Sequence, residues 1–340
     1  MTRPQIAVAS LGGTITMVPQ GAASSAVVPK MTVEDLLLTA PALTDLADLS
    51  AETLATIPGA SLDFPDIFAA LDWASDQVDA GADGVVVAQG TDTIEETAYL
   101  FDLHWGRQEP IVVTGAMKPP AAGSDGPANL LAAVRVAIAA ASRGRGCLVV
   151  LHDEVHTAAR VRKTRASGVG AFASPGFGPT GYVEEGQVVF GDQPSRWPSL
   201  DRPGGTAATR VALLETCLGD DASLLELVRE ARFNGIVLAG FGVGHVSAAV
   251  AQSVADAIES CPVVLASRTG AGTTYAGTYG FVGSESDLLA RGAIPAGWLD
   301  PRKARILLHS LLAAGFDIQE IRGEFSSRST LTGPVSGRDH

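Results

Sequence analysis

Val85-Val86-Val87-Ala88-Gln89-Gly90-Thr91-Asp92-Thr93-Ile94-Glu95-Glu96 is the stretch that decides the fold. It begins as a short apolar run, becomes polar after Gly90, and continues into a segment with helical apolar periodicity. This pattern predicts a buried strand, a tight turn and a helix over residues 93–104. Because open parallel sheets bind ligands outside the carboxyl ends of their strands, Thr91 and Asp92 are predicted to face a substrate.

The same residues also have a purely structural interpretation. Asp92 with Glu95, and Thr93 with Glu96, each match a capping box, in which two side chains satisfy backbone N–H groups at a helix start. Taken alone, the segment favours this interpretation, so a functional assignment needs support from other parts of the chain.

Composition places the chain among globular α/β proteins. Its 340 residues are 46% hydrophobic and 18% charged, which is enough for two domains and too hydrophobic for disorder. A formal net charge of -13 without a Lys/Arg stripe argues against a nucleic-acid partner. No apolar stretch is long enough to span a membrane or to be read as a targeting segment. Three cysteines without metal or redox spacing favour a reducing compartment, so we expect a cytoplasmic protein without a metal site.

Strand and helix patterns alternate along most of the chain. This alternation predicts a large α/β domain over residues 1–193, built on a doubly wound and mostly parallel sheet. The segment 194–209 is rich in Pro, Gly, Ser and Thr and is predicted to be a linker. The alternation then restarts in a smaller α/β domain over residues 210–340. Residues 17–33 carry small side chains and few anchors, which predicts an irregular loop that can act as a lid.

A second threonine follows paired glycines near the N-terminus. Thr14 comes after Gly12-Gly13 at the end of a strand predicted over residues 6–10, where the glycines allow a tight turn and leave the hydroxyl uncrowded. If this strand lies beside strand 85–88, Thr14 and Thr91 face the same crevice. A threonine hydroxyl needs a base or a proton path to act as a nucleophile, and a desolvated lysine can serve as that base. Lys163 is the candidate for that base.

The other charged groups around Lys163 are predicted to be solvent-exposed. Arg160, Arg162 and Arg165 lie within a few residues of it and are interpreted as a solvated basic face. None of the histidines occurs in a nucleophile–base pattern, and no carboxylate pair or His-x-x-x-His spacing indicates a metal.

Several blocks of the sequence resemble the signature blocks of the bacterial asparaginase/glutaminase family. They run in order over nearly the whole chain, which makes them far more specific than a lone glycine pattern. The blocks are Leu11-Gly12-Gly13-Thr14-Ile15, Gln89-Gly90-Thr91-Asp92-Thr93-Ile94-Glu95-Glu96-Thr97-Ala98, Val113-Thr114-Gly115-Ala116-Met117-Lys118-Pro119, Ser124-Asp125-Gly126-Pro127-Ala128-Asn129-Leu130, Ala171-Phe172-Ala173-Ser174-Pro175, Gly178-Pro179-Thr180-Gly181-Tyr182 and the region from Asp300 to Leu312.

This resemblance implies an amidohydrolase that converts L-asparagine to L-aspartate and ammonia without a cofactor. By similarity, Thr14 matches the nucleophile that forms an acyl-enzyme. Thr91 matches a second catalytic threonine, which is linked to Lys163 and Asp92. The family also implies a homodimer or a homotetramer, with active sites at a dimer interface.

The resemblance also implies a set of substrate-binding residues. Ser61 and Asp92 match the groups that hold the α-carboxylate and α-amino groups of the substrate. Leu62 occupies a binding position where the family often has glutamine. Backbone groups around Gly90, Thr91 and Ala116 would contact the substrate and stabilise the oxyanion, as rigid amide donors do where negative charge develops.

Besides Leu62, the chain departs from the family pattern at three places. The segment 17–33 lacks the tyrosine that the family's mobile segment carries close to the nucleophile, and Thr269 to Tyr279 contains no acid where a partner subunit often supplies a glutamate. His245 stands where an asparagine is usual. Because a threonine nucleophile needs a neighbour that relays its proton, Tyr275, or with less support Tyr279, is the candidate to replace the absent tyrosine. The alternative is that both rings only pack within the smaller domain.

Two other functions stay open from the sequence. The chain could be a mixed glutaminase-asparaginase; the scaffold also resembles an ammonia-releasing subunit of amidotransferases that act on misacylated transfer RNA, but that subunit carries an extra N-terminal domain that is not expected here. It could also be a catalytically weak amino-acid-binding sensor that keeps the substrate clamp. The two strand-end threonines and Lys163 argue against a sensor without turnover. The missing tyrosine and glutamate are the reason to keep it as an alternative.

Overall fold

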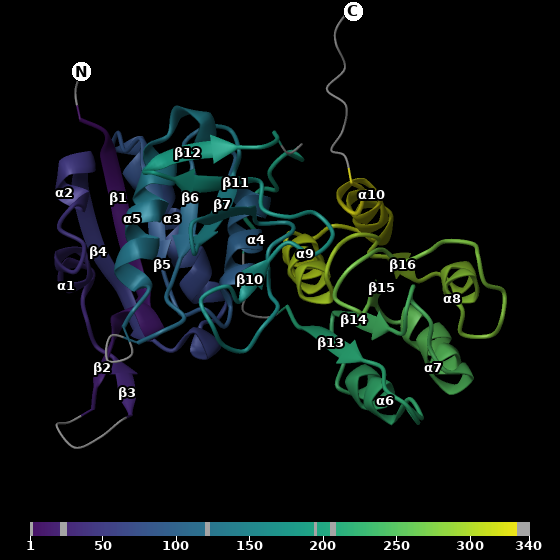
Figure 1. The fold of residues 1–340 in the computed structure, drawn as a ribbon. Helices are drawn as coiled ribbons and strands as arrows, with labels where there is room; N and C mark the ends of the chain where they lie inside the picture. The colour runs from purple at the N-terminus through teal and green to yellow at the C-terminus, as the bar shows by residue number, and fades with distance from the viewer. Residues whose placement is uncertain (1–2, 21–25, 120–122, 194–195, 205–208, 332–340) are drawn as a thin grey trace, which may run out of the picture. The chain divides into compact units, whose positions relative to one another are not determined.

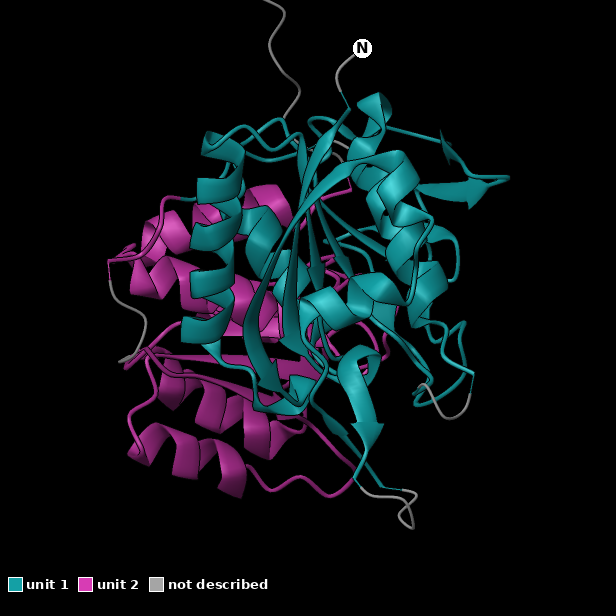
Figure 2. Ribbon diagram, turned by 90° about the vertical axis from the view of Figure 1, so that its left-hand side faces the viewer, with its two compact units in different colours: residues 1–200 teal, residues 201–340 magenta. Residues whose placement is uncertain are grey.

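The computed structural model describes residues 3–20, 26–119, 123–193, 196–204 and 209–331. The chain divides into two compact units, residues 1–200 and 201–340 (Figure 2). The predicted segment 194–209 includes this division. Its role as a linker, and the domain limits derived from it, stay predictions, and residues 194–195 and 205–208 lie outside the described part of the chain.

Unit 1 is built on an eight-stranded sheet with the order β12-β11-β8-β7-β6-β5-β1-β4 (Figure 1). Five neighbouring strands, from β4 to β7, pair in parallel, whereas β8, β11 and β12 pair antiparallel. The strands of this sheet are β1 (Gln5–Gly12), β4 (Asp48–Ile57), β5 (Gly84–Ala88), β6 (Ile111–Thr114), β7 (Cys147–Leu151), β8 (Glu154–Thr157), β11 (Gly181–Glu184) and β12 (Gln187–Phe190).

Helices cover both sides of the unit 1 sheet (Figure 2). One layer packs through the apolar side chains of α1, α2 and α5 against alternate residues of β1, β5, β6 and β7. The other layer contains α3 and α4, which contact β1, β5, β6 and β7. The helices are α1 (Val33–Leu38), α2 (Leu43–Leu46), α3 (Phe64–Asp79), α4 (Ile94–His104) and α5 (Gly126–Ile138), with 3₁₀ turns η1 (Thr14–Thr16), η2 (Gly59–Ser61) and η4 (Ala140–Ser142).

The central strands are apolar at nearly every position because both of their faces are covered. All five residues of β5 are buried, and so are all five of β7. Such continuous apolar runs are the mark of a parallel sheet between two helical layers. The α/β class with a large, mostly parallel sheet that the sequence predicts is therefore confirmed.

The prediction of an irregular loop over residues 17–33 is wrong for part of the segment. Residues Met17–Pro19 (β2) and Val27–Pro29 (β3) form an antiparallel hairpin, and residues 21–25 between them lie outside the described part of the chain. Its base is tied to η1 by hydrogen bonds from the backbone N–H groups of Lys30 and Met31 to the carbonyl of Thr16. A second small sheet pairs β9 (Arg162–Lys163) with β10 (Phe172–Ala173).

Unit 2 is a smaller domain with a four-stranded, all-parallel sheet in the order β13-β14-β15-β16. Its apolar core lies between this sheet and helices α6 and α7, and α9 contacts β13, β14 and β15. The elements are β13 (Val211–Glu215), α6 (Ser223–Glu230), β14 (Gly235–Gly240), α7 (Ala248–Ile258), β15 (Val263–Ser267), α8 (Glu285–Arg291), β16 (Ile294–Pro295), α9 (Pro301–Ala313) and α10 (Ile318–Arg328). Over the described ranges, no helix is both long and apolar enough to cross a membrane.

Candidate functional site

Three glycines bring three loops together at the carboxyl edge of the unit 1 sheet. Gly13 follows β1, Gly59 follows β4 and Gly90 follows β5. A Cβ atom on Gly13 would lie 2.1 Å from the Cα atom of Gly90, and one on Gly59 would lie 2.9 Å from the carbonyl oxygen of Gly90. Only backbone fits in these contacts, so glycine is required at each position for the loops to meet.

Thr14 is presented by the first of these loops. Gly12 and Gly13 have φ angles of 100° and 81°, which L-residues with side chains rarely adopt, and they turn the chain into η1. Thr14 opens that 3₁₀ turn and is partly buried. Its hydroxyl has no hydrogen-bond partner in the part of the chain that the structure describes. The side chain is therefore available for chemistry.

Thr91 and Asp92 lie in the loop after β5, and Lys163 reaches both of them. The Lys163 Nζ atom donates to the Thr91 hydroxyl at 3.0 Å and lies 2.7 Å from the Asp92 carboxylate. The lysine side chain is 16% exposed and the Asp92 side chain is 62% exposed. Because β1 and β5 are neighbouring parallel strands, Thr14 and Thr91 leave the sheet at the same edge. Lys163 is thus hydrogen-bonded to one of the two threonines that the sequence selects.

The capping boxes that the sequence allows at the start of α4 are absent. Thr93 is the N-cap residue, but its side chain accepts no hydrogen bond from the first turn. Its hydroxyl instead donates to the Gly59 carbonyl at 3.0 Å. The buried carboxylate of Glu95 accepts the backbone N–H of Lys163 at 3.0 Å. Two side chains that could cap the helix therefore contact other segments of the site.

Ala116 lies in a fourth loop, which follows β6. The carboxylate of Asp125 accepts the backbone N–H groups of Met117 at 3.1 Å and Lys118 at 2.8 Å, and the Asn129 amide donates to the Gly115 carbonyl at 2.9 Å. These bonds hold the turn around the buried Ala116 rigid. Asp125 is also the N-cap residue of α5, and its carboxylate is used for this turn instead of for the helix.

Ser61 and Leu62 lie at the end of η2, directly after Gly59. Ser61 is exposed and Leu62 is partly buried. The backbone N–H of Ser61 donates to the Pro58 carbonyl at 2.9 Å, and that of Leu62 donates to the Gly59 carbonyl at 3.3 Å. Since the Gly59 backbone touches that of Gly90, the structure brings the loop of Ser61 next to the loop of Thr91 and Asp92.

The prediction of a solvated basic face is wrong for two of its three arginines. Arg165 is exposed, but Arg160 packs its guanidinium 4.4 Å from the centre of the Phe177 ring and Arg162 is partly buried. Burial lowers the pKa of Arg160 below its usual value. The segment is therefore part of the structure that carries Lys163.

His156, which lies in β8, is buried and structural. Its Nδ1 atom lies 3.0 Å from the Ser174 hydroxyl and its Nε2 atom 3.2 Å from the Glu154 carboxylate. Burial lowers the pKa of His156 to about 4, so the imidazole is neutral at pH 7. This agrees with the absence of a nucleophile–base pattern around it.

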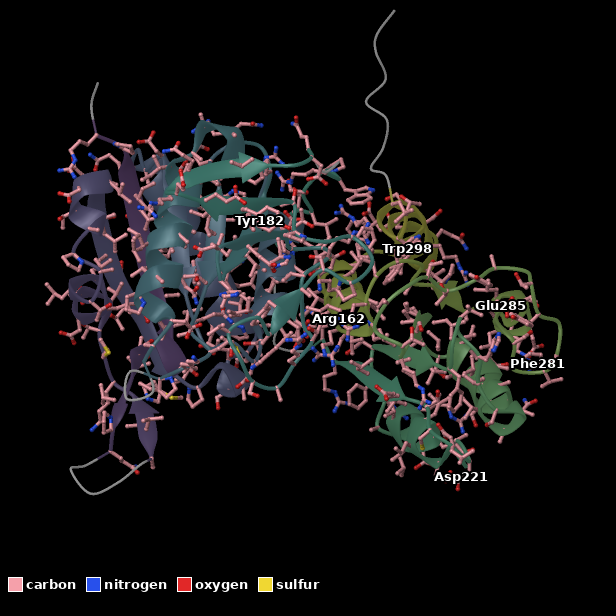
Figure 3. All side chains as sticks on the ribbon, viewed as in Figure 1. Arg162, Tyr182, Asp221, Phe281, Glu285 and Trp298 are labelled. Atoms are coloured by element: carbon pink, nitrogen blue, oxygen red, sulfur yellow. The ribbon has the colours of Figure 1, made fainter. Side chains whose placement is uncertain are left out.

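In unit 2, Tyr275 and Tyr279 are 43% and 44% exposed. The Tyr279 ring packs edge-on against His245, with ring centres 4.8 Å apart, and the Phe281 ring lies 5.0 Å from the same histidine. Figure 3 shows Phe281 and Glu285 in the same part of this unit. Thr14 belongs to unit 1, so a role of either tyrosine toward Thr14 stays a prediction.

An acid does contact the 269–279 segment, although none lies within it. The buried Glu285 accepts the backbone N–H groups of Thr278 and Tyr279, each at 2.8 Å, and lies 3.1 Å from His245 Nε2. Burial opposes the charged form of Glu285, but these hydrogen bonds outweigh it and hold its pKa below the usual value. The carboxylate therefore fixes the backbone around Tyr279.

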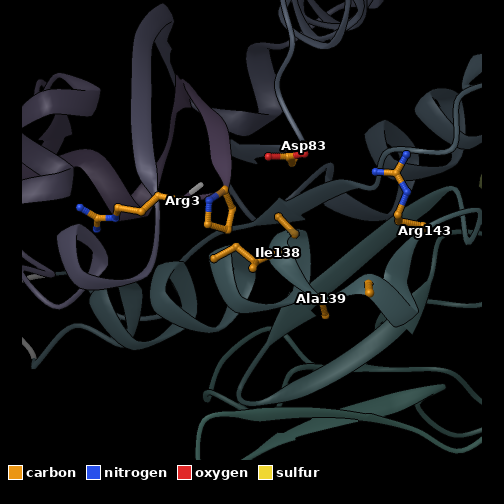
Figure 4. Close-up of a pocket in the computed structure, with 8 residues that line it drawn as sticks. Arg3, Asp83, Ile138, Ala139 and Arg143 are labelled. Carbon is orange, nitrogen blue, oxygen red and sulfur yellow. The ribbon is translucent and has the colours of Figure 1, made fainter. Parts of the chain in front are cut away.

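A pocket at the opposite end of the sheet is not part of this site. It is lined by Pro4 before β1, Asp83 before β5 and the end of α5, together with Arg3 and Arg143 (Figure 4). Arg143 pairs with Glu109 at 2.6 Å, and Arg3 lies 3.5 Å from Asp48. Both cations are already paired with acids, which makes the pocket a weak anion site.

Four residues of the site were not assigned a catalytic or binding role from the sequence. Gln89, Glu95, Asp125 and Asn129 all lie within the blocks that resemble the family, but Glu95 was given only a place in a capping box and the other three no separate role. The signal available was a polar residue at the edge of an apolar run, as at Gln89, or inside an apolar helix, as at Asn129. No cluster of three or more His, Cys, Asp or Glu side chains that could hold a metal occurs among the described residues.

Both halves of the chain match models of a known protein family. The model described as "Asparaginase, N-terminal" matches residues 5–196, and that described as "Glutaminase/Asparaginase C-terminal domain" matches residues 210–325. The chain is 32% identical over 330 residues to a protein named L-asparaginase 2 from Escherichia coli (strain K12), covering 95% of this chain and 93% of that one.

Two further comparisons agree with these matches. A protein from Haemophilus influenzae named "Probable L-asparaginase periplasmic" is 32% identical over 329 residues, covering 95% of this chain and 92% of its own. The crystal structure of a "Probable Cytoplasmic L-asparaginase" from Campylobacter jejuni superimposes with a TM-score of 0.86 at 30% identity, covering 95% of this chain and 99% of that one. With family models matching both of its units and relatives similar over almost its full length, the chain belongs to the asparaginase/glutaminase family.

Proposed function

We propose that this chain hydrolyses L-asparagine to L-aspartate and ammonia through an acyl-enzyme on Thr14. The observation that carries the proposal is the contact of Lys163 with Thr91 at 3.0 Å and with Asp92 at 2.7 Å, at the sheet edge where Thr14 also lies. A threonine with a free hydroxyl, a second threonine and a lysine together supply a nucleophile and a proton path.

In the first half of the reaction, the Thr14 oxygen attacks the carbon of the side-chain amide. The proton of the hydroxyl passes toward the Lys163–Thr91 pair, and negative charge develops on the amide oxygen. Backbone N–H groups around Thr91 and Ala116 stabilise that charge, because both loops are held rigid by the contacts described above. The intermediate collapses as this proton passes on to the amide nitrogen, the C–N bond breaks, ammonia leaves, and a β-aspartyl ester remains on Thr14.

In the second half, water attacks the ester carbonyl, and the same oxyanion donors stabilise the second intermediate. The Thr14 hydroxyl is released with a proton returned to it, and L-aspartate leaves. The proton path serves both halves, since a group that accepts a proton in one step returns it in the next. No cofactor is needed for either half.

The α-amino and α-carboxylate groups of the substrate bind on either side of the glycine contact. Asp92 presents an exposed carboxylate to the ammonium group, and Ser61 an exposed hydroxyl to the carboxylate. Gly90 and Leu62 belong to the two loops that carry these groups and whose backbones touch at Gly59 and Gly90. Two fixed contacts at one end of the substrate direct its other end toward the nucleophile.

An ammonia-release assay tests this proposal. Turnover of L-asparagine well above that of L-glutamine and D-asparagine is expected. Comparable rates with L-glutamine would favour the mixed glutaminase-asparaginase, for which the apolar Leu62 in place of a glutamine is the motivating observation. Binding of L-asparagine without ammonia release would favour the sensor and contradict the proposed function.

We further propose that the active protein is a homodimer or homotetramer in the cytoplasm. Activity is expected to require at least a dimer, because the family resemblance implies that active sites lie at a dimer interface. Light scattering combined with activity assays over a dilution series checks this. A fully active monomer would rule it out. The names of the relatives include both a periplasmic and a cytoplasmic protein, and cell fractionation tests the location.

The two tyrosines of unit 2 give a further prediction. Tyr275→Phe is expected to lower kcat by about 10-fold to 100-fold, because its hydroxyl is proposed to relay a proton to or from Thr14. Tyr279→Phe is expected to be nearly silent, since phenylalanine keeps the edge-on packing against His245. The measurement is steady-state ammonia release with both variants. Wild-type turnover in both would mean that the proton leaves through water or Lys163.

A further inference from the structure

Thr93 is the N-cap residue of α4, and its side chain bonds to other segments instead of to its own helix. An N-cap threonine ordinarily accepts a backbone N–H of the first turn, and Thr93 does not. Its hydroxyl donates to the Gly59 carbonyl at 3.0 Å and accepts a hydrogen bond from Gln89 Nε2 at 3.2 Å. The helix therefore gives up a capping bond, and the hydroxyl joins two loops of the site.

Gln89 is fully buried, and its amide is oriented by this arrangement. Its Nε2 atom donates to the Gly90 carbonyl at 3.3 Å as well as to Thr93. Both of those contacts need the amide nitrogen, which leaves Oε1 buried without a partner among the described residues. A buried amide oxygen without a partner is destabilising, so stability alone does not account for a glutamine at this position.

The hydrogen bonds form one continuous connection from Gly90 through Gln89 and Thr93 to Gly59. Gly90 immediately precedes Thr91 and Asp92, while Gly59 begins the 3₁₀ turn that ends at Ser61. The backbones of Gly59 and Gly90 also touch directly, with no space for a Cβ atom between them. The glycine contact sets how close the two loops come, and the hydrogen bonds set how they are aligned.

We propose that Thr93 and Gln89 are positioning residues that fix the separation between Ser61 and Asp92, and thereby set the affinity for the α-amino-acid end of the substrate. The inference rests on the proposed function, in which Ser61 and Asp92 hold the two charged groups of the substrate. Neither Thr93 nor Gln89 touches the reacting atoms. Their loss therefore weakens binding of both substrate and product and leaves the chemical step largely unchanged.

The test compares Thr93→Val, which removes only the hydroxyl, with Thr93→Ser, which retains it. In Thr93→Val, KM for L-asparagine is expected to rise about tenfold while kcat changes less than about threefold. The Kd for the product L-aspartate, measured by calorimetry, is expected to rise in parallel. Thr93→Ser is expected to restore both constants. A merely structural role would not predict this combination of a KM effect and rescue.

Two further variants complete the experiment. Gln89→Met keeps the volume of the side chain and removes both the donated bonds and the unpaired oxygen, so it is expected to raise KM with a thermal midpoint within about 3 °C of wild type. Thr44→Val is the matched control, because the Thr44 hydroxyl also donates to a backbone carbonyl, that of Pro41 at 2.8 Å, on an exposed part of α2. It is expected to leave KM and Kd unchanged.

The outcomes separate this inference from the proposed function. Unchanged KM and Kd in both Thr93→Val and Gln89→Met would overturn the positioning role, whatever happens to their thermal midpoints. A wild-type protein that binds L-aspartate but releases no ammonia would contradict the proposed function, and the Kd comparison would then decide the positioning role by itself. Absence of both binding and turnover in the wild type would overturn both.

Discussion

Thr14→Val is expected to lower kcat for ammonia release by at least about 10³-fold while the protein stays folded. Valine has nearly the shape of threonine but no hydroxyl, so the acyl-enzyme cannot form. The Thr14 hydroxyl has no partner among the described residues, so its removal breaks no hydrogen bond that the structure describes. The thermal midpoint is therefore expected to stay within about 2 °C of wild type.

Thr16→Val is the matched comparison, because it makes the same change two residues later in the same 3₁₀ turn. Thr16 is fully buried, and its hydroxyl donates to the Gly13 carbonyl at 3.0 Å. Loss of that bond is expected to reduce the free energy of unfolding by about 1 kcal/mol. Its effect on kcat is expected to be at most about tenfold, since the group does not contact the substrate.

The pair of variants distinguishes a nucleophile from a residue that merely shapes the turn. Steady-state assays and thermal denaturation of both proteins provide the comparison. If Thr14→Val keeps most of the wild-type activity, Thr14 is not the nucleophile and the acyl-enzyme would have to form elsewhere. If Thr14→Val instead unfolds at the assay temperature, its loss of activity would be attributable to folding and not to the missing hydroxyl.

The parallel part of the fold could be predicted from the sequence because burial on both faces leaves a simple pattern. β5 and β7 are apolar at all or nearly all positions, and the buried residues of α3 recur at helical spacing. Short elements were missed because they hold too few buried residues to show such a pattern. β9 and β10 have two residues each, and α8 buries only Glu285 and Leu288, so neither kind of element shows a period.

The antiparallel turn between β7 and β8 illustrates a different limit. His152 and Asp153 both have positive φ angles, 55° and 60°, although neither is glycine. The Asn129 side chain accepts the backbone N–H of His152 at 2.9 Å and supports this turn from another element. Turn signals based on glycine or asparagine cannot detect a conformation that a tertiary contact imposes.

The site itself shows which contacts a sequence can and cannot specify. Strand ends and glycine pairs indicated Thr14 and Thr91, because the edge of a parallel sheet follows from the order of its strands. The contacts of Thr93 and Glu95 with other loops could not be predicted, since local capping offers each side chain a nearer partner. At both residues the side chain forms a tertiary contact with another segment of unit 1.

Lys163→Met is expected to lower kcat by about 10²-fold or more, with a smaller change in KM. The Lys163 Nζ atom is 3.0 Å from the Thr91 hydroxyl and 2.7 Å from the Asp92 carboxylate, and methionine fills a similar volume without donating to either. Asp92 is mostly exposed, so water can replace the lost ion pair. The free energy of unfolding is therefore expected to fall by less than about 1 kcal/mol.

Lys163→Arg separates the role of charge from the role of proton transfer. Arginine keeps the positive charge beside Asp92 but stays protonated at all accessible pH values, so it cannot accept a proton from Thr91. If Lys163 handles a proton, Lys163→Arg is expected to be about as inactive as Lys163→Met. If only its charge matters, arginine is expected to restore a large part of kcat.

The measurement is the pH dependence of kcat and kcat/KM for the wild type and both variants, with thermal denaturation as the check on folding. A proton-transfer role predicts that the wild-type profile contains an ionisation that disappears in both variants. Lys163→Met with at least about a third of the wild-type kcat would contradict the assignment, because loss of a catalytic proton acceptor costs far more than that. In that case Lys163 would only pair with Asp92, and the proton of Thr14 would have to leave through water or a tyrosine of unit 2.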